Sequence, residues 1–337
     1  MSNTELKYLL IVPYRKFYYV FFFLFLFVVS CRKQNVDLTP LAIYNTGYAF
    51  RINDLFLQTD SIWFAVGGVR GEEGVILRTD DAAITWSKFN TEFPRSMYCV
   101  NFLNEQMGFA GGEYLQLWRT SDGGNSWNYY GLDQQVPFNE EDRPSIRDFE
   151  FSNDSCWFFC GGENLGEGVV YETRNTGANW NFIFRQNEFR SLVLLNEDRI
   201  AVGGHGLVLS KSDRIDNLSS ADFVDDFMTG MTVIGDDHCI GVTYNGAILR
   251  ASNSAMNWIV LEKGNAAFKA RINWNDVDAF GDHIVAVGNE GVVAESTDSG
   301  VNWRYYEVVN SPELISVKVV KDFVLATTSD GRILRLF

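Results

Sequence analysis

A segment of eight residues recurs along this chain at intervals near forty residues, and it constrains the fold more than any single residue does. The copies read TSDGGNSW at 120–127, STDSGVNW at 296–303, TRNTGANW at 173–180, TDDAAITW at 79–86 and ASNSAMNW at 251–258, with a degenerate copy at 210–218. Self-similarity at a fixed period of this length is typical of repeat architectures, in which each repeat is one supersecondary unit.

Three positions of the segment have a clear chemical reason. The third residue is Asp or Asn, whose side chain accepts hydrogen bonds from backbone N–H groups of its own turn. The fifth is Gly in three copies and Ala in two, and Gly tolerates backbone conformations that other residues resist. The last is Trp, a large apolar anchor. We therefore predict structural turns formed by Asp122, Gly124 and Trp127; Asn175, Gly177 and Trp180; Asp298, Gly300 and Trp303; Asp81 and Trp86; and Asn253 and Trp258.

This pattern, (Ser/Thr)-x-Asp-x-Gly-x-x-Trp, resembles the Asp-box of the bacterial neuraminidase repeat. The match is strong at 120–127 and 296–303 and clear in the three other full copies. In that family the box is structural and sits far from any active site. The resemblance therefore implies that these turns contribute to stability rather than to activity.

A second phrase precedes the boxes and gives the number of repeats. It reads AVGG at 65–68, FAGG at 109–112, FCGG at 159–162 and AVGG at 201–204, and it weakens at 240–242, 286–288 and 325–328. A Gly and an apolar run follow, so each unit consists of short strands separated by a Gly turn and a box turn. Such units at this period indicate a β-propeller. The count predicts an all-β, seven-bladed propeller of four-stranded antiparallel blades.

The last unit reaches Phe337 before its outermost strand. The segment Leu41–Phe50 has no unit of its own, and we expect about 44–50 to pair antiparallel with 332–336. That pairing would close the ring and remove the exposed edges of a linear array. Six or eight blades would leave a strand unmatched. A single propeller domain, residues 41–337, then accounts for the length of the chain.

The first thirty residues have the pattern of a targeting segment. A basic region is followed by Phe17–Val29, an apolar run of thirteen residues that is too short for an ordinary transmembrane helix. The run leads into Val-Val-Ser-Cys, which resembles a bacterial lipobox, where the cysteine becomes the lipidated N-terminus. We predict a lipoprotein signal peptide at 1–30, a lipidated Cys31 with a strandless tether to residue 40, and an exported protein anchored to the cell envelope at the outer membrane. The alternative is a signal anchor with a chance cysteine.

Charge and cysteines exclude several classes of function. The whole chain carries −15 and residues 1–30 carry +2, so the remainder carries −17, which argues against nucleic acid and against anionic membranes. Cys156 and Cys160 lie four apart on one strand, about 13 Å, and cannot form a disulfide with each other. With Cys99 and Cys239 we expect them to be buried apolar residues, and we expect no metal and no cofactor.

Length variation among the repeats falls on one face of the predicted ring. The interval from Trp127 to Trp180 is 53 residues, against 38 to 45 elsewhere, with the surplus at 131–145 and 163–167, and the first unit adds 69–73. Insertions gathered on one face of adjacent blades mark a candidate binding surface. Tolerated insertions also accumulate where loops are free, and this explanation stays open.

Arginines recur near the starts of the innermost strands, at Arg95, Arg147, Arg190 and Arg271. In an acidic protein, arginines around one entrance would form a local positive surface suited to carboxylate or phosphate. Surface ion pairs with acidic neighbours are an equally good explanation. The candidate partner-binding residues are these four arginines together with Glu140 and Glu163 of the inserted loops.

The whole chain after residue 30 resembles the photosystem II stability/assembly-factor family of Asp-box propellers. Members of that family bind a partner protein with an arginine-bearing surface. The resemblance implies a non-catalytic propeller that binds an envelope protein as an assembly or scaffolding factor. The identity of that partner does not follow from the sequence.

Two other functions stay open at this point. A sialidase-type glycoside hydrolase also carries Asp-boxes, and Phe50-Arg51-Ile52-Asn53 is similar to the sialidase Phe/Tyr-Arg-Ile-Pro motif without its Pro. Six blades are the rule in that family, and its arginine triad and Tyr–Glu pair cannot be placed from spacing. A glycan-binding surface would use aromatic side chains such as Tyr130, Tyr244 or Trp274, for which core packing is the simpler use.

We predict that Cys31→Ala abolishes lipid attachment and releases the protein from the membrane, because the thiol is the attachment point in a lipobox. Envelope fractionation and the mass of the N-terminal peptide test this. Unchanged membrane association, with no lipid mass on the unsubstituted chain, would contradict the prediction.

Overall fold

The computed structural model describes residues 36–91, 93–132, 143–196, 199–212, 215, 218–220, 226–235, 238–252, 255, 257–263 and 272–337. The chain divides into two compact units, Met1–Lys33 and Gln34–Phe337, and the described residues all belong to the second. Among them, no helix has the length and apolar character needed to cross a membrane. Four predicted residues lie outside this described part: Cys31, Glu140, Asn253 and Arg271.

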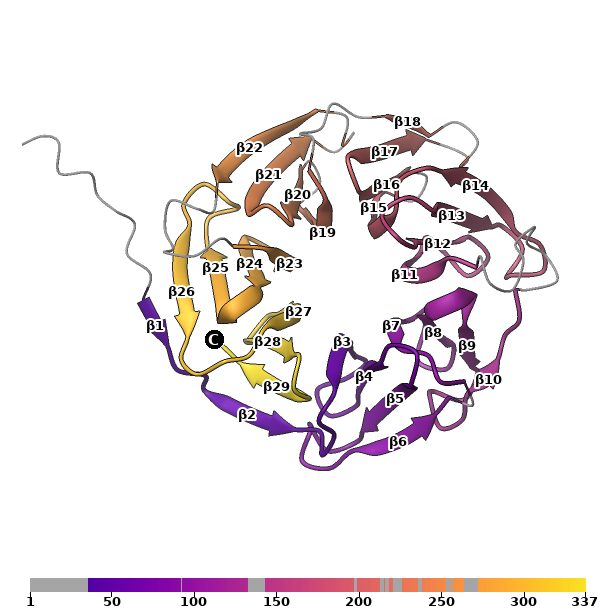
Figure 1. Cartoon of the computed structure of the whole chain (residues 1–337), viewed down its shortest axis with the longest axis horizontal. Coiled ribbons are helices and arrows are strands. Elements are labelled where there is room, and N and C mark those ends of the chain that lie inside the picture. Colours follow the sequence, from indigo (N-terminus) through magenta and orange to yellow (C-terminus); the bar gives the residue numbers. More distant parts are fainter. Residues whose placement is uncertain are drawn as a thin grey trace, which may run out of the picture. The chain divides into compact units, whose positions relative to one another are not determined.

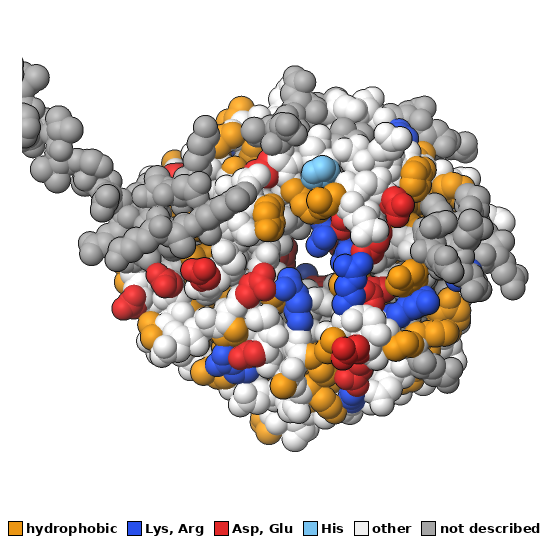
Figure 2. Space-filling model, in the orientation of Figure 1, with side chains coloured by type: hydrophobic (Ala, Val, Ile, Leu, Met, Phe, Trp, Pro, Cys, Tyr) orange, Lys and Arg blue, Asp and Glu red, His pale blue; other side chains and the backbone are white. Residues whose placement is uncertain are grey.

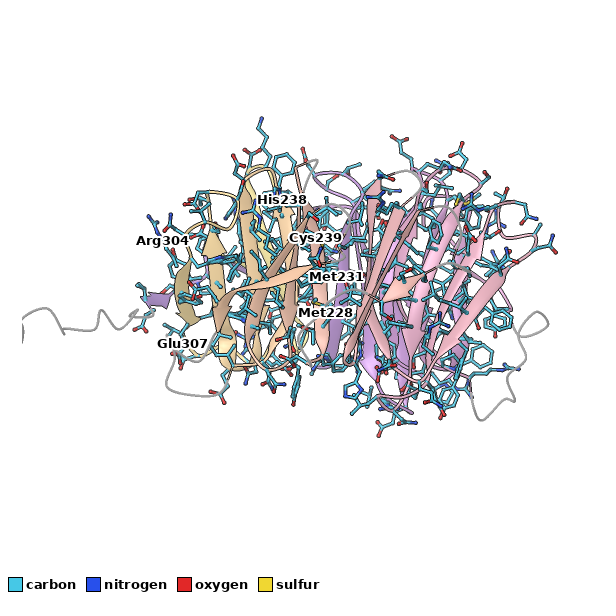
Figure 3. The ribbon with its side chains drawn as sticks, turned by 90° about the horizontal axis from the view of Figure 1, so that it is seen from above. Met228, Met231, His238, Cys239, Arg304 and Glu307 are labelled. Atoms are coloured by element: carbon cyan, nitrogen blue, oxygen red, sulfur yellow. The ribbon has the colours of Figure 1, made fainter. Side chains whose placement is uncertain are left out.

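The described strands form seven sheets around a central axis (Figure 1). Within each sheet the strands succeed one another from the axis to the rim, and they run between the two faces of the ring (Figure 3). In chain order, the first sheet consists of β3 (Arg51–Leu57), β4 (Trp63–Val69), β5 (Glu73–Thr79) and β6 (Ser87–Asn90), and the second of β7 (Met97–Phe102), β8 (Gly108–Gly112), β9 (Leu117–Thr120) and β10 (Asn128–Tyr129). The third consists of β11 (Ser145–Phe151), β12 (Trp157–Gly162), β13 (Gly168–Thr173) and β14 (Asn181–Arg185). The fourth consists of β15 (Phe189–Asn196), β16 (Arg199–Gly204), β17 (Leu207–Ser212) and β18 (Ser219–Ser220).

The remaining sheets include the two strands from the N-terminal end of the described chain. The fifth sheet consists of β19 (Met228–Ile234), β20 (His238–Thr243), β21 (Ala247–Ser252) and β22 (Trp258–Lys263). The sixth consists of β23 (Trp274–Phe280), β24 (His283–Gly288), β25 (Val292–Ser296), β26 (Arg304–Val308) and β1 (Val36–Leu38). The last consists of β27 (Leu314–Val320), β28 (Phe323–Thr328), β29 (Arg332–Arg335) and β2 (Ala42–Asn45).

The sheet of β23–β26 departs from the predicted fold class. Its fifth strand, β1, runs parallel to β26, with Val36 opposite Tyr306 and Leu38 opposite Val308. The prediction of seven four-stranded antiparallel blades is therefore wrong, because only six of the sheets have that form. The strandless tether to residue 40 fails at the same place. Residues 36–38 lie outside every repeat and carry no sequence motif that could have predicted a strand. The open edge of β26 positions them, because it offers unpaired backbone groups.

Strand β2 closes the ring as predicted. It pairs antiparallel with β29, Ala42 opposite Arg335 and Asn45 opposite Arg332. The predicted segment, about 44–50, is wrong in its bounds, because the strand begins at Ala42 and ends at Asn45. Thr46 ends it by donating a hydrogen bond from Oγ1 to the carbonyl of Gly331 at 2.7 Å. Phe50 then packs among the apolar side chains between the first and last sheets.

The hydrophobic core lies between neighbouring sheets rather than inside any one of them. Ile240 of the fifth sheet packs with Trp274 and Ile284 of the sixth, and Ile52 of the first packs with Ile333 of the last. An isolated sheet would leave both of its faces in water, so each depends on its two neighbours for burial. Ring closure therefore completes the core as well as the edges.

The repeated turns form the hydrogen bonds that their sequence predicts. Asp122 Oδ1 accepts from the backbone N–H of Ser126 at 2.9 Å and from Thr120 Oγ1 at 2.8 Å. Asp298 accepts from the N–H of Asn302 at 2.8 Å in the same way. The bonds from Ser126 and Thr120 lower the pKa of Asp122 to about 2, because they stabilise the ionised carboxylate.

The fifth position of these turns is left-handed in each copy that the structure describes there. Gly124, Gly177 and Gly300 have φ of 81°, 82° and 82°, and Ala83 and Ala255 take φ of 69° and 48°. The alanines adopt a conformation that glycine reaches without strain, so these two turns are held by the tertiary structure. The Trp side chains are buried at Trp127, Trp258 and Trp303 and partly buried at Trp86 and Trp180.

Cys99, Cys156, Cys160 and Cys239 are buried thiols within the hydrophobic core, which confirms the prediction of apolar packing residues. Burial raises the pKa of the Cys239 thiol to about 12, so it remains an unreactive thiol at neutral pH.

We predict that deleting residues 41–46, which removes β2, lowers the melting temperature by roughly 10 °C or more, because one edge and one inter-sheet core are exposed and each kcal/mol is worth about 2–4 °C in a domain of this size. The matched control deletes 36–38, which removes β1 and leaves the ring-closing pair intact. Thermal melts followed by circular dichroism test both, and equal melting of the parent and the 41–46 deletion would contradict the prediction.

Candidate functional site

Each innermost strand carries a β-bulge near its start. In β11 the register shifts by one residue between Ile146 and Asp148, and the other six innermost strands shift at the corresponding place. A bulge leaves an extra residue unpaired and re-aims its side chain. The bulge residues, which we call the bulge ring, all line the central cavity: Asn53, Tyr98, Arg147, Arg190, Thr229, Asn275 and Ile315.

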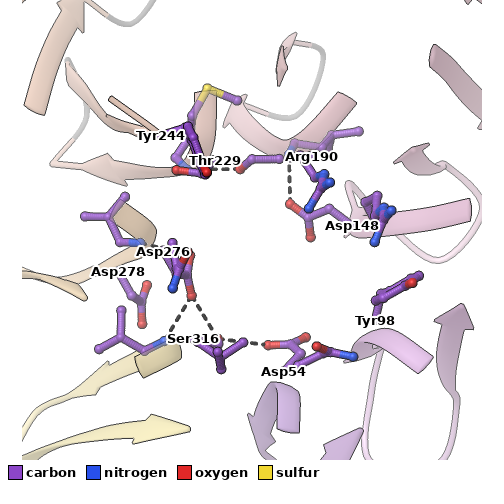
Figure 4. Close-up of a pocket in the computed structure, with 18 of the residues that line it drawn as sticks. Asp54, Tyr98, Asp148, Arg190, Thr229, Tyr244, Asp276, Asp278 and Ser316 are labelled. Atoms are coloured by element: carbon purple, nitrogen blue, oxygen red, sulfur yellow. Dashed lines mark hydrogen bonds between the residues drawn. The ribbon is translucent and has the colours of Figure 1, made fainter. Parts of the chain in front are cut away.

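The sheets enclose a central cavity of about 1290 Å³. The bulge ring forms its mouth, and Tyr98, Arg190 and Thr229 project into it from three different sheets (Figure 4). Lysine and arginine side chains gather around the opening, with acidic side chains beside them (Figure 2). The mouth lies where the innermost strands begin and the second strands end, which is the face on which the loop insertions were predicted.

An alternating row of arginines and glutamates crosses the mouth over the first four sheets. Arg70 Nε lies 3.0 Å from Glu113 Oε1, and its Nη2 contacts Glu163. Arg147 Nη2 lies 3.8 Å from Glu163 Oε2. It lies 3.4 Å from Glu188 Oε1, which also accepts a 2.6 Å bond from Arg190 Nε. We call these residues the Arg–Glu array: Arg70, Glu113, Glu163, Arg147, Glu188 and Arg190.

The two signs of charge in the array differ in exposure. The side chain of Arg70 is 63% exposed, whereas that of its partner Glu113 is 2% exposed. Arg190 is 37% exposed over Glu188, which is 2% exposed. In these two pairs the carboxylate lies beneath the guanidinium group, whereas Arg147, 9% exposed, is more buried than Glu163 at 16%. Solvent therefore meets mainly the donors of Arg70 and Arg190. Guanidinium forks of this kind bind carboxylate or phosphate in two-pronged geometry.

The array fixes the charge of its buried members. Burial alone would raise the pKa of Glu188, but Arg190 and Arg147 outweigh it and lower that pKa. Glu163 raises the pKa of Arg70. Glu188 and Arg70 are therefore ionised at neutral pH, and removal of Arg70 would leave the buried Glu113 carboxylate without its arginine partner.

Aromatic rings support the arginines. The Arg147 guanidinium carbon lies 3.9 Å from the centre of the Tyr98 ring, and that of Arg190 lies 5.2 Å from the centre of Phe227. Tyr98 donates a hydrogen bond from its hydroxyl to Glu113 Oε1 at 3.1 Å. Burial raises the pKa of Tyr98, which keeps this hydroxyl protonated as a donor.

Two residues at the rim of the mouth have strained backbones. Tyr114 and Leu165 take φ of 57° and 64° at equivalent turns of the second and third sheets, and both side chains are exposed. Non-glycine residues in this region cost about 1–3 kcal/mol and gather at ligand-binding sites. Arg95 stacks on Tyr114 at 4.2 Å from the ring centre. The rim therefore presents apolar surface next to the arginines.

Below the mouth, the innermost strands supply a belt of acidic side chains around one lysine. We call these residues the acidic belt: Asp54, Asp148, Glu150, Asp276, Asp278 and Lys318. All of them except Asp276 also line a second cavity of about 280 Å³. Burial raises the pKa of Asp148 to about 7, of Glu150 to about 8 and of Asp276 to about 6. Among the described residues, no group of His, Cys, Asp and Glu has the arrangement of a metal site.

The predicted site residues are brought together only in part. Arg147, Arg190 and Glu163 meet in the Arg–Glu array. Arg95 does not hold the equivalent position, because Tyr98 is the bulge residue of its strand and Arg95 lies three residues earlier. Arg271 and Glu140 lie outside the described residues.

Sequence reasoning missed Arg70 and Glu113, and it expected Glu188 only as an ion-pair neighbour of the arginines, which its contact with Arg190 bears out. A signal for Glu113 was present, since Gly-Gly-Glu occurs at both 111–113 and 161–163. Arg70 belongs to the inserted loop 69–73, and that loop was predicted as part of the binding face. Its contacts with Glu113 and Glu163 cross from the first sheet to the second and third, and a repeat pattern does not encode such contacts.

Comparisons with known proteins identify the fold. No protein-family model matches the chain, and no curated protein matches it. Among solved structures, "YCF48 bound to D1 peptide" is 17% identical with a TM-score of 0.70, covering 91% of this chain and 98% of that one. YCF48 from Cyanidioschyzon merolae is also 17% identical with a TM-score of 0.65, covering 88% and 98%. The RRP9 WD40 repeats are 11% identical with a TM-score of 0.66, covering 90% and 99%.

At these identities the likeness shows the fold alone. The resemblance to propellers of the photosystem II assembly-factor type is confirmed at that level.

We predict that the free energy of unfolding falls as the pH rises from 5 to 8. The folded-state pKa values of Asp148 and Glu150, about 7 and 8, lie above the usual values near 4, so their contribution is fully present below pH 4 and is lost as pH rises through 7 to 8. Denaturant unfolding measures it, and Asp148→Asn should flatten the pH dependence by on the order of 1–2 kcal/mol.

The matched control for this experiment is Asp122→Asn. The pKa of Asp122 is lowered to about 2, so its contribution is constant between pH 5 and 8 and the substitution should leave the slope unchanged. A slope that is the same in the Asp148→Asn variant as in the parent would refute the assignment.

Proposed function

We propose that this chain is a non-catalytic propeller that binds a carboxylate-bearing segment of a partner protein across the mouth of its central cavity. We further propose that it acts as an assembly or scaffolding factor held at the cell envelope by a lipid on Cys31. The mouth supplies the recognition chemistry, and the acidic remainder of the surface discourages other anionic partners.

One observation carries the proposal, namely that the exposed Arg70 and Arg190 lie over buried glutamates. Arg70 is 63% exposed while Glu113 is 2% exposed, so a partner carboxylate can approach the guanidinium without first displacing a surface acid. The exposed Tyr114 and Leu165 flank the array and offer apolar contact. Binding energy at protein surfaces concentrates at such arginine and aromatic positions.

A neighbour of the same fold adds support. The structure described as "YCF48 bound to D1 peptide" holds a peptide on a ring that superposes on this one with a TM-score of 0.70. A propeller of this form is therefore compatible with peptide binding. The chemistry proposed for the present chain rests on its own residues.

A sialidase-type hydrolase is the second candidate, because Tyr98 and Glu113 form a hydrogen-bonded pair near arginines. Each described arginine that lines the mouth is already paired with a glutamate, Arg51 with Glu313 at 2.9 Å included. Burial raises the pKa of Tyr98, which opposes nucleophilic attack by its phenolate. These contacts favour binding over hydrolysis. Of the aromatic residues considered for glycan binding, Trp274 is fully buried.

The test begins with a photocrosslinking residue at Leu165 in intact cells, which identifies the partner. A peptide from the crosslinked region is then titrated against the parent, Arg70→Gln and Arg70→Lys. We expect Arg70→Gln to weaken binding about tenfold or more, since a charge-assisted hydrogen bond is worth roughly 1.5–3 kcal/mol. Arg70→Lys should retain part of the affinity, because it keeps the charge and loses the fork.

The matched control is Arg304→Gln, an exposed arginine on the outer strand β26, which should leave the peptide affinity unchanged. The loss caused by Arg70→Gln should vanish when the carboxylates of the peptide are replaced by amides. Equal loss on amide peptides would refute carboxylate recognition. Hydrolysis of a fluorogenic sialoside that disappears in Tyr98→Phe would refute the non-catalytic assignment.

A further inference from the structure

We propose that the outer rim of the propeller, at the seam between the sixth and last sheets, docks onto the surface of a lipid bilayer. This inference rests on the proposed membrane anchoring and concerns a surface on the rim of the ring, apart from the mouth. The residues that form the docking seam are Val36, Leu41, Ile43 and Val309.

Strand β1 places the seam close to any N-terminal anchor. Val36 is fixed to the outer edge of the ring by parallel pairing with Tyr306 of β26. Only four residues, 32–35, lie between it and Cys31, and the five Cα-to-Cα steps from Cys31 to Val36 span at most about 18 Å. A lipid on Cys31, as proposed above, would therefore keep this part of the rim within reach of the membrane.

The seam is apolar on the side that faces between the two sheets. Leu38 packs into the core of the last sheet, and Val36, two residues earlier, lies on the same face of β1 because side chains alternate along a strand. Tyr44 of β2 packs against Trp63 of the first sheet, with ring centres 5.7 Å apart, so Ile43 lies on the opposite face of β2, away from the first sheet.

The members of the seam are unusually exposed for aliphatic residues. Val36, Leu41, Ile43 and Val309 are between 47% and 67% exposed. The backbone N–H of Val309 donates to the carbonyl of Leu38 at 3.1 Å, and that of Leu41 donates to Arg335 at 2.8 Å. These bonds hold the exposed side chains on ordered backbone. Four exposed aliphatic side chains held on paired or hydrogen-bonded backbone at residues 36–43 and 309 make this seam a candidate interaction site.

The charges around the seam select the kind of membrane surface. Asp37 lies opposite Glu307 in the β1–β26 register, on the face of the sheet away from Val36 and Leu38. Arg304 and Glu307 mark this rim strand in the side view (Figure 3). Because the chain after residue 30 carries −17, docking should be stronger on zwitterionic than on anionic lipid.

Tethering makes a small apolar seam sufficient. A short linker gives the seam an effective concentration at the membrane in the millimolar range, so weak contacts are populated. Aliphatic side chains at the boundary between headgroups and acyl chains add modest affinity, and a single lipid chain alone gives only marginal binding. Docked by its rim, the ring would stand on edge, and the mouth would open along the membrane toward segments of neighbouring membrane proteins.

The experiment places an environment-sensitive dye on a cysteine introduced at Ile43, with Ile259→Cys as the matched control. Both are exposed isoleucines on outermost strands, β2 and β22, of different sheets. The described native cysteines are buried, and the unsubstituted chain gives the labelling background. The full chain with its anchor is reconstituted into phosphatidylcholine vesicles that carry brominated acyl chains, and flotation establishes anchoring.

We expect bromine to quench the dye at position 43 severalfold more strongly than the dye at position 259. Leu41→Asp and anionic vesicles should each reduce the quenching at position 43. Ile84→Asp, on a distant turn, should leave it unchanged. Equal quenching at both positions in floating protein overturns the docking and leaves the anchoring intact. A chain that does not float refutes the anchoring and this inference with it. A dye response at 43 that needs no vesicles and grows with protein concentration would assign the seam to a second copy of the chain.

Discussion

Side chains of the innermost strands hold neighbouring sheets together, and the rest of the ring depends on this interaction. Innermost strands of adjacent sheets form no ladder with each other in the described part, so their facing N–H groups need other acceptors. Asp54 Oδ2 accepts from Val100 N at 3.0 Å, and Asp148 Oδ2 accepts from Leu192 N at 2.8 Å. Asp276 Oδ2 accepts from Val317 N at 3.0 Å. Each bond crosses from one sheet to the next, so carboxylate side chains connect the innermost strands of neighbouring sheets around the axis.

This use of carboxylates explains the electrostatics of the cavity. Five acidic side chains converge at the axis, and burial raises the pKa of four of them, Asp148, Glu150, Asp276 and Asp278. Lys318 lies among them and offsets part of the repulsion, with its Nζ 3.5 Å from Asp54 Oδ1. Burial would lower the pKa of Lys318, but Asp54 and Asp278 lead the acids that raise it instead. Burying these carboxylates near one another costs electrostatic free energy, and the hydrogen bonds that they form to backbone N–H groups of neighbouring strands offset part of that cost. The same bulges that aim the belt inward also aim Arg147 and Arg190 at the mouth.

The mouth combines rigid support with exposed donors. Arg147 is held between two glutamates and the Tyr98 ring, so its guanidinium is pre-positioned before any partner arrives. Arg70 reaches the array from a loop of the first sheet, with contacts to the second and third. A binding surface built from three sheets is sensitive to ring closure, and this links the strand β2, far away at the rim, to the geometry of the site.

The sequence alone determined the repeat, the β-propeller class, the structural turns around Asp122 and Asp298, the buried cysteines and closure by an N-terminal strand, because these depend on local chemistry that recurs with the period. It also placed Arg147, Arg190 and Glu163 near one entrance, since loop insertions and innermost strands have fixed places in a repeat. Only the tertiary structure decided that β1 pairs with the edge of β26 and that Arg70 forms ion pairs with Glu113 and Glu163. It also decided that Arg95 stacks on Tyr114 instead of joining the Arg–Glu array. The physical reason is that these contacts join segments from different repeats, and which edges and charges meet is set by the packing of the closed ring.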